Sequence, residues 1–193
     1  MSDIMISEIL HRSAEVKNKM ISVCAGPAEQ AAQMIATSMQ EGGKLMLCGN
    51  GGSAGDSQHL AAEFVATLDH TKPRPSLPAL SLTTDTSFLT AYANDFGFEG
   101  VFARQVEALG QPGDVLLGIS TSGNSKNVLA AAKAAKDNQI SVIAFTGETG
   151  GQMADFSDLL VAIPSRIIMH IQECHIALGH AITARVETLL SEK

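Results

Sequence analysis

The sequence has no tryptophan, one tyrosine and seven phenylalanines, so aromatic residues make up only 4% of its 193 residues. It also lacks a run of basic residues: 13 Lys and Arg stand against 20 Asp and Glu, which gives a formal net charge of −7. Because nucleic-acid phosphates are bound by clustered Lys and Arg, this balance argues against a nucleic-acid partner. A phosphorylated small molecule would therefore be held mainly by hydroxyl groups and backbone N–H groups.

Cysteine and long apolar segments are also scarce. Cys24, Cys48 and Cys174 are far apart and form no C-x-x-C pair, which is typical of thiols in a reducing compartment. No apolar run approaches the length of a membrane span. The first ten residues lack the basic region of a signal peptide. We therefore expect a soluble cytoplasmic protein that has no membrane association.

What is present suits one globular domain over residues 1–193, with 45% hydrophobic and 17% charged residues. Apolar positions at helical spacing predict two N-terminal helices, over residues 3–23 and 28–39, separated by Gly26-Pro27. Neither helix carries evident chemistry. We expect residues 1–40 to serve packing or oligomerisation.

Apolar strand-like segments alternate with helical segments in the rest of the chain. Strands are predicted at residues 44–48, 79–82, 115–119, 140–145 and 159–163, and the last helix at residues 168–190. This alternation predicts an α/β fold, a doubly wound and mostly parallel five-stranded sheet with helices on both faces. Ligands of such sheets bind beyond the carboxyl ends of the strands, where the strand order reverses.

The stretch Cys48–Phe64 has the composition of an anion site. A short apolar strand runs into Gly-Asn-Gly-Gly, and Ser53 then opens an alanine-rich helix. Free N–H groups and the helix dipole favour an anion at such a turn. The alternative is that Ser53 only caps the helix. The turn matches neither the P-loop nor the dinucleotide-binding pattern.

A second strand–turn–helix unit repeats this arrangement. Its turn, Ser120-Thr-Ser-Gly-Asn-Ser125, carries four hydroxyl groups in six residues and follows the predicted strand 115–119. Two loops of this kind indicate a phosphate site more strongly than one loop does. The alternative for Ser125 is again a plain helix cap. On the first helix, His59 and Glu63 are four residues apart and so share one face, as an acid–base or metal pair or as a surface pair.

Five motifs carry a family resemblance. They read Cys48-Gly-Asn-Gly-Gly-Ser53; Gln58-His59 with Glu63; Ala93-Asn94-Asp95-Phe-Gly97; Gly113-Asp114-Val-Leu-Leu-Gly-Ile-Ser-Thr-Ser-Gly-Asn-Ser125; and Ile171-Gln172-Glu173 with His175 and His180. In this order and spacing they resemble the SIS-type phosphosugar isomerases, and among these the phosphoheptose (sedoheptulose 7-phosphate) isomerases. The resemblance runs from about residue 44 to the C-terminus, and more weakly before it.

The resemblance implies a flavodoxin-like SIS fold and a homotetramer with active sites at subunit interfaces. It implies an aldose–ketose isomerisation that makes D-glycero-D-manno-heptose 7-phosphate for bacterial surface glycans such as lipopolysaccharide. It implies one zinc ion per active site, bound by His59, Glu63, Gln172 and His180. It also implies substrate contacts at Asn50, Gly51, Gly52, Ser53, Glu63, Asn94, Asp95, Ser120, Thr121, Ser122, Ser125 and Gln172.

The chemistry agrees with these roles. Moving a proton between C1 and C2 through an enediol needs a base near carbon and an acid–base group near the oxygens. Glu63 suits the first role and His180 the second. Zinc accepts His nitrogen and carboxylate oxygen and could polarise the carbonyl group. A Glu that binds zinc tightly is a poorer base, so the two roles of Glu63 are in tension. We expect His175 to have a packing or supporting role, and the role of His170 is open.

The spacing of Gln172 and His180 on one helix bears on whether a single chain can supply all four zinc ligands. Gln172 and His180 are eight residues apart on one predicted helix, about 12 Å along its axis, whereas the ligands of one zinc lie about 2 Å from it. We therefore expect a neighbouring chain to supply one of them. The alternative is a bend or break between the two, which Gly179 could assist.

Three positions depart from the family pattern, namely Thr67, Met169 and His170. They lie near the expected sugar-binding region, so the sugar is less firmly indicated than the reaction. One alternative is an isomerase of another phosphosugar. The other is a non-catalytic protein-binding module of the same fold, which the presence of Glu63 disfavours.

Overall fold

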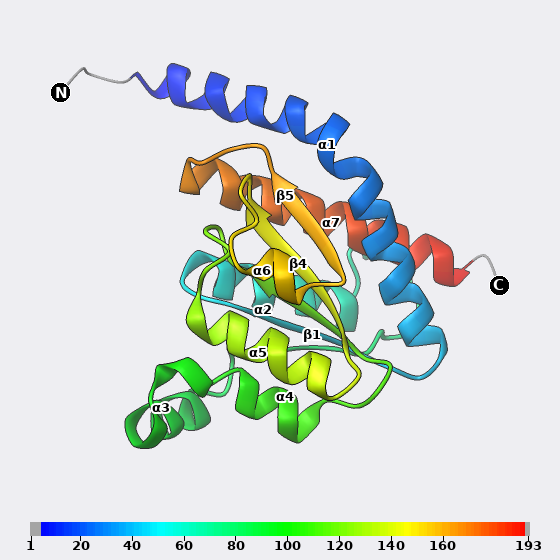
Figure 1. Cartoon of the computed structure of the whole chain (residues 1–193). Helices are drawn as coiled ribbons and strands as arrows, with labels where there is room; N and C mark the ends of the chain where they lie inside the picture. Colours follow the sequence, from blue (N-terminus) through cyan, green and yellow to red (C-terminus); the bar gives the residue numbers. More distant parts are fainter. Residues whose placement is uncertain (1–4, 192–193) are drawn as a thin grey trace.

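Five short strands rich in Val, Ile and Leu form one parallel sheet in the structure, a computed structural model that describes residues 5–191 (Figure 1). The strands are β1 (Leu45–Gly49), β2 (Ala79–Ser81), β3 (Val115–Ile119), β4 (Ser141–Gly147) and β5 (Leu159–Ile163). β1 and β3 are buried along their whole length, as expected for central strands covered on both faces. All five predicted strands are confirmed.

The strand order is β2-β1-β3-β4-β5, and every neighbouring pair is parallel. From β1 the chain first adds β2 on one side and then returns to add β3 on the other, so the order reverses between β1 and β3. These two strands pair up to Gly49 opposite Ile119. The predicted switch point therefore lies directly above the ends of β1 and β3, where both candidate loops begin.

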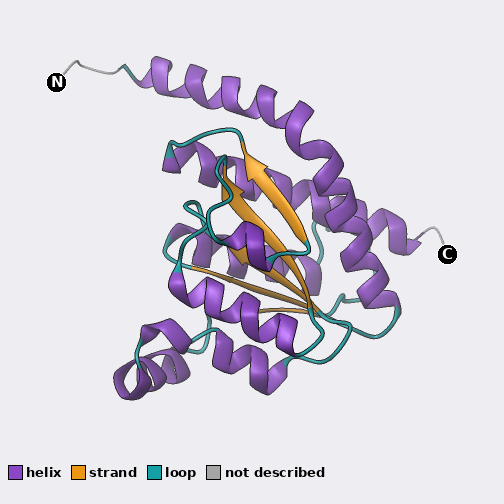
Figure 2. Cartoon of the chain, viewed as in Figure 1, coloured by secondary structure: helices purple, strands orange, loops and turns teal. Residues whose placement is uncertain are grey.

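Helices cover both faces of the sheet (Figure 2). The helices are α1 (Ile6–Gln40), α2 (Gly52–Val65), α3 (Thr86–Phe96), α4 (Ala103–Leu109), α5 (Lys126–Asp137), α6 (Met153–Phe156) and α7 (Ile168–Ser191), with a 3-10 turn η1 (Phe98–Gly100). Side chains alternate between the faces: Leu45 and Leu47 pack under α1, α2 and α7, whereas Met46 and Cys48 pack under α4, α5 and α6. The doubly wound fold is confirmed.

The N-terminal region differs from the prediction. One helix, α1, spans Ile6–Gln40 with Pro27 inside it, where two helices were expected. Figure 1 shows α1 changing direction between its two halves, and proline bends a helix in this way because it lacks an N–H group and clashes with the preceding turn. Burial of Ala31, Ala32 and Ile35 after the proline offsets that cost.

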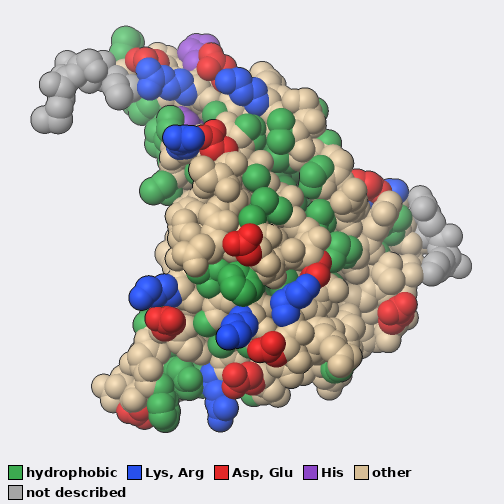
Figure 3. Space-filling view, viewed as in Figure 1, with side chains coloured by type: hydrophobic (Ala, Val, Ile, Leu, Met, Phe, Trp, Pro, Cys, Tyr) green, Lys and Arg blue, Asp and Glu red, His purple; other side chains and the backbone are tan. Residues whose placement is uncertain are grey.

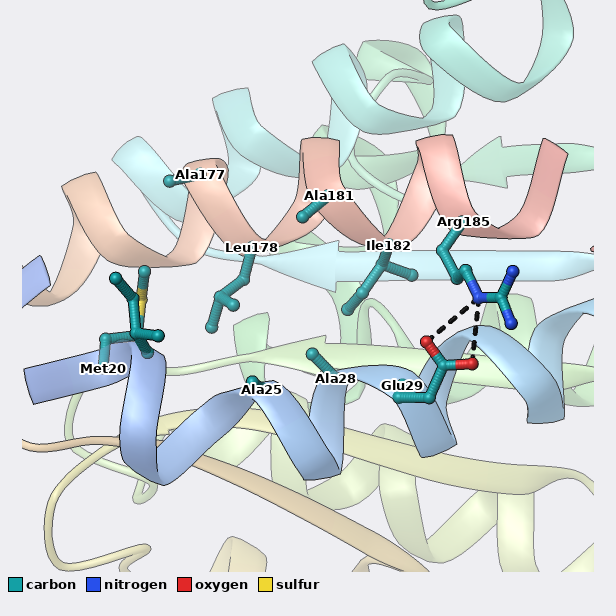
Figure 4. Close-up of a pocket in the computed structure, with 10 residues that line it drawn as sticks. Met20, Ala25, Ala28, Glu29, Ala177, Leu178, Ala181, Ile182 and Arg185 are labelled. Carbon is teal, nitrogen blue, oxygen red and sulfur yellow. Dashed lines mark hydrogen bonds and ion pairs between the residues drawn. The ribbon is translucent and has the colours of Figure 1, made fainter. Parts of the chain in front are cut away.

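Helix α1 packs along α7. Figure 4 shows Met20, Leu178 and Ile182 pointing into the groove between the two helices, which encloses a mainly apolar cavity of about 300 Å³. At one end Arg185 Nε donates to both carboxylate oxygens of Glu29, at 2.9 and 3.0 Å. This contact joins α1 to α7, the helix that carries the predicted site residues Gln172 and His180.

Helix α3 stands apart from the body of the molecule (Figure 1) and has no buried residue. Leu89, Tyr92 and Ala93 pack against the core from one side of it. Its aromatic rings also contact one another: the ring centroids of Phe88 and Tyr92 are 5.5 Å apart, and those of Tyr92 and Phe96 are 5.0 Å apart. Gly97, with φ of +91°, ends the helix. The sequence motif Asn94-Asp95 therefore lies in the last turn of an exposed helix, before the predicted turn.

The surface agrees with the charge balance. On the face drawn in Figure 3, Lys and Arg side chains are scattered and accompanied by Asp and Glu. Among residues 5–191, no helix combines the length and apolarity needed to cross a membrane. Cys24, Cys48 and Cys174 are buried free thiols, in agreement with their predicted packing role.

Candidate active site

The first loop leaves β1 at Gly49 and enters α2 within three residues. Gly51 has φ of +56°, a conformation that favours glycine, and it is the N-cap of α2. A Cβ on Gly49 would lie 2.7 Å from the Cβ of Ser53, so the turn requires glycine there too. Ser53 is buried inside the first turn of the helix and makes no capping bond. The structure therefore does not support the reading of Ser53 as a plain helix cap.

The second loop, residues 120–125, joins β3 to α5. Ser120 Oγ donates to Ser125 Oγ at 3.0 Å, and the backbone N–H of Asn124 donates to Ser122 Oγ at 3.1 Å. Ser125 is the N-cap residue of α5, yet its side chain makes no capping bond. The hydroxyl groups of the loop are thus held near one another at a helix N-terminus, a common environment for an oxyanion.

The two loops are joined by a pair of asparagines. Asn50 Nδ2 donates to Asn127 Oδ1 at 2.8 Å, and Asn127 Nδ2 donates to Asn50 Oδ1 at 2.8 Å. Asn127 was not among the predicted site residues. The only sequence signal for it is a second asparagine two residues beyond the hydroxyl-rich turn. We call the loops 50–53 and 120–125 together the cradle.

Three of the four predicted metal-binding side chains lie together, and two of them, Glu63 and His180, were also predicted as catalytic. His59 and Glu63 come from α2 and His180 from α7; one ligand atom of each lies within 4.8 Å of the others. His59 Nε2 is 2.7 Å from His180 Nε2 and 3.4 Å from Glu63 Oε1. We call this group the His59–Glu63–His180 cluster. Nearby, burial raises the pKa of the Asp56 carboxyl group, and the His59 and His180 rings oppose that shift.

The cluster has the donor set of a zinc site. Two imidazole nitrogens and a carboxylate oxygen are common zinc ligands, and their partial exposure leaves a position open to substrate. Two nitrogens on one tetrahedral zinc would lie about 3.3 Å apart. The 2.7 Å contact between His59 and His180 would therefore open slightly to admit the ion.

Gln172, the fourth predicted ligand, lies elsewhere. A Cβ on Gly52 would come within 2.7 Å of Gln172 Nε2, so this amide sits against the cradle. Helix α7 runs unbroken from Ile168 to Ser191, and Gly179 lies against Leu60 within it. The break considered as an alternative is absent. Gln172 contacts the first turn of α2, whereas His180 lies beside His59 and Glu63 further along that helix.

The other histidines of α7 are buried. His175 donates from Nε2 to the carbonyl oxygen of Thr146 at 3.1 Å and packs against the Phe145 ring. Burial lowers the pKa of His175 to about 4, and the bond to Thr146 partly opposes that shift. His170 is 1% exposed, with Nδ1 3.9 Å from a Glu173 oxygen. His175 thus supports the end of β4, in line with the expected supporting role.

Asn94 and Asp95 are exposed and bonded to each other, with Asn94 Nδ2 donating to Asp95 Oδ1 at 2.8 Å. A cavity of about 550 Å³ lies between the end of α3 and the cradle. It is lined by Asn50, Phe96, Gly97, Phe98, Glu99, Ser125, Lys126 and Asn127. Lys126 Nζ lies 3.8 Å from Glu99 Oε2. Lys126 therefore places a cation at the edge of the cradle, and this residue was not among the predicted site residues.

Comparison with known proteins gives the family. The pattern that defines the SIS domain matches residues 10–147. The chain belongs to the SIS domain family. It is 48% identical over 188 residues to a phosphoheptose isomerase of Aquifex aeolicus, covering 97% of both chains. It is 51% identical over 167 residues to the phosphoheptose isomerase of Rhodospirillum rubrum, covering 86% of this chain and 88% of that one.

Solved structures of SIS family members agree with this fold. A phosphoheptose isomerase from Neisseria gonorrhoeae superposes with a TM-score of 0.89 at 43% identity, over 95% of this chain and 97% of that one. One from Francisella tularensis superposes with a TM-score of 0.91 at 35% identity, over 95% and 96% of the two chains. The similarity therefore spans the cradle, the cluster and all five strands.

Proposed function

We propose that the chain is an aldose–ketose isomerase that converts sedoheptulose 7-phosphate to D-glycero-D-manno-heptose 7-phosphate, a step in heptose synthesis for bacterial surface glycans. The observation that carries the proposal is the cradle and the His59–Glu63–His180 cluster at opposite ends of one helix, α2. The near full-length similarity to proteins named phosphoheptose isomerase supports the substrate.

The cradle would bind the phosphate group. Two helix N-termini, those of α2 and α5, meet at its loops and offer unpaired N–H groups. Ser53 and the hydroxyl groups of residues 120–125 add further donors. This arrangement suits an acidic chain, because it places positive partial charge at the site without a cluster of Lys and Arg. Asn94 and Asp95, in the last turn of α3 just before the residues that line the adjoining cavity, would bind sugar hydroxyl groups.

The cluster would move the protons. Glu63 would remove the proton from the carbon next to the carbonyl group and return it to the neighbouring carbon through an enediol. His180 would shuttle the proton between the two oxygens. His59 would hold His180 in place, since their Nε2 atoms are in contact. A carboxylate and an imidazole on facing helices can reach both sides of one enediol.

His59, Glu63 and His180 would also hold a zinc ion, with Gln172 as the fourth ligand. A bound zinc ion would polarise the carbonyl group of the substrate and stabilise negative charge on its oxygen. If the ion is held there, His59 and Gln172 would serve as neutral ligands, and Glu63 and His180 would each need an atom that is free of the metal for proton transfer. Loss of one metal per site in Glu63 variants would mark Glu63 as a ligand as well as a base.

We further propose a homotetramer with active sites at subunit interfaces, acting in the cytoplasm. Gln172 lies against Gly52 at the cradle, which supports a site whose fourth ligand comes from a second copy. Large apolar side chains on α1 are exposed, with Ile6 at 77%, Leu10 at 62% and Ile21 at 66%. An apolar helix face of this kind is typical of a surface that packs in an oligomer.

Isomerisation of another phosphosugar is the second candidate, because of the three family departures. The structure reduces their weight. His170 is buried, and the Thr67 hydroxyl group donates to the carbonyl oxygen of Asp69 at 3.2 Å. Only Met169, at 45% exposure, is available to a ligand. A non-catalytic binding role would not need the His59–Glu63–His180 cluster.

The test is a panel of ketose phosphates from five to seven carbons, incubated with purified protein and followed for aldose formation. We expect sedoheptulose 7-phosphate to be turned over with the highest kcat/KM. If another ketose phosphate is preferred, the proposed substrate is wrong but the proposed reaction still holds. No aldose from any member, with metal-loaded and folded protein, would contradict the proposal. Metal analysis and light scattering on the same sample test the zinc ion and the tetramer.

A further inference from the structure

The cradle contains a pair of reciprocal side-chain bonds that the proposed reaction does not use directly. Asn50 and Asn127 lie 77 positions apart, and each amide donates to the other at 2.8 Å. Asn50 is the first residue after β1, and Asn127 is the second residue of α5. Asn127 is 4% exposed, while Asn50 is partly exposed. We call these two bonds the amide clasp.

The clasp joins elements that otherwise diverge. β1 and β3 are paired up to Gly49 and Ile119, but the helices that follow them pack on opposite faces of the sheet. In the described part of the chain, no other side-chain hydrogen bond links residues 50–53 to residues 120–127. The relative position of the two loops beyond the sheet therefore depends on this contact.

The chemistry of the clasp makes it specific for two amides. Each residue gives one N–H donor and one carbonyl acceptor, so removal of either side chain breaks both bonds. An unpaired polar group at buried Asn127 or on its partner carries a desolvation cost. An aspartate at either position would keep one bond and set two oxygens against each other. The clasp thus acts as one unit, because truncation of either side chain removes both bonds.

We propose that Asn127 is a positioning residue that holds the Asn50 loop so that the N–H groups of α2 and the hydroxyl groups of residues 120–125 face one phosphate group. The inference rests on the proposed function for the identity of the phosphate ligand. Asn127 acts through Asn50 and through the loop that follows it. Its loss therefore changes phosphate affinity and leaves the His59–Glu63–His180 cluster, further along α2, intact.

The test compares Asn127→Ala, Asn50→Ala and the double variant with wild-type protein in the full chain. We expect each single variant to raise KM for sedoheptulose 7-phosphate, and the dissociation constant for inorganic phosphate measured by calorimetry, by about tenfold. We expect kcat of Asn127→Ala to stay within about threefold of wild type. In the double variant the effect should equal that of Asn50→Ala alone, because that change already removes the whole clasp.

Asn138→Ala is the matched control, since Asn138 Nδ2 donates to Ala134 O at 2.8 Å at the far end of the same helix. A merely structural asparagine lowers the melting temperature and leaves KM unchanged, as we expect for this control.

Unchanged KM and phosphate affinity in folded Asn127→Ala, or multiplying effects in the double variant, would overturn the proposal. If Asn127→Ala does not fold, Asn127→Asp, which keeps only one of the two bonds, takes its place. If wild-type protein lacks isomerase activity, the phosphate measurement still decides, because it needs no turnover.

Discussion

Gln172 lies against the backbone of Gly52, so closely that a Cβ added there would come within 2.7 Å of Gln172 Nε2. This contact connects α7 to the first turn of α2. Gly52 is the first residue of α2, and its φ is not in the left-handed region that favours glycine. Glycine is therefore required at this position by the neighbouring amide and not by the backbone. The position offers a way to move Gln172 without replacing it.

We expect Gly52→Ala to lower kcat/KM by about tenfold or more, because the methyl group displaces the Gln172 amide from the cradle. Stability should change little, since the displaced atom ends a flexible side chain. Gly55→Ala, on the same helix with no atom within 4 Å of its Cβ, is the control and should retain activity. Steady-state kinetics and thermal melts of both variants check this. Full activity in Gly52→Ala would mean that Gln172 has no role in its own chain's cradle.

Glu63→Gln should lower kcat by about two orders of magnitude or more, because the amide cannot accept the carbon proton. The fold should survive, since Glu63 is partly exposed on α2 and its carboxylate lies beside His59 and His180 and not in the core. Glu107→Gln, which removes an exposed carboxylate on α4, is the control. Turnover and exchange of the substrate C–H proton with solvent deuterium are the measurements. Normal exchange in Glu63→Gln would remove it as the base.

Ser122→Ala and Ser125→Ala should mainly weaken substrate binding, by about 1–3 kcal/mol each if a phosphate oxygen loses its donor. Ser125 already accepts from Ser120, which leaves its own proton free to donate. Ser141→Ala is the hydroxyl control, because Ser141 is the first residue of β4 and lies at the opposite end of the strands from the cradle. Calorimetric titration with inorganic phosphate separates binding from turnover. Unchanged phosphate affinity in the variant that combines Ser122→Ala with Ser125→Ala would show that the loop does not bind the phosphate group.

His175 predicts a pH dependence of stability. Its pKa is about 4 in the folded chain and near 6.5 when unfolded. Between these values the unfolded state binds more protons, so the free energy of unfolding falls as pH drops from about 6.5 towards 4. The loss is at most about 3 kcal/mol. Urea unfolding at pH 7 and 4.5 should show a smaller loss in His175→Gln than in wild type. Exposed His11→Gln is the control, and equal losses in all three would contradict the assignment.

Local signals were enough for most of the fold but not for the contacts within the site. The five strands and the two loops follow from short apolar segments, glycines and hydroxyl residues adjacent in sequence. The break predicted at Pro27 was wrong because packing of later α1 residues outweighs the cost of proline, and only the tertiary structure contains that packing. The amide clasp and the Gly52–Gln172 contact join residues far apart in sequence, and no local pattern identifies such partners. His59 and Glu63 were predicted as a pair because helix periodicity alone places them on one face.

The last prediction concerns how a complete site is assembled. His59, Glu63 and His180 meet within one chain, whereas Gln172 lies eight residues before His180 on an unbroken helix, about 12 Å along its axis. To share a zinc ion with His180 of its own chain, Gln172 would have to stretch along the helix axis towards it, because zinc ligands lie about 2 Å from the metal, whereas its amide lies against Gly52. We therefore expect a neighbouring copy to supply Gln172, so that each site combines residues of two chains.

Complementation between inactive variants tests this assembly. Gln172→Ala and His180→Ala homo-oligomers should each be nearly inactive. Unfolded and refolded together, they should form some sites in which one chain supplies Gln172 and the other His180, and so regain part of the wild-type activity. A mixture of Glu63→Gln with His180→Ala is the control: both residues belong to the same chain's cluster, so no mixed site regains both. Mixed oligomers that are verified by mass and remain inactive, or a metal-bound structure with all four ligands from one chain, would contradict the shared site.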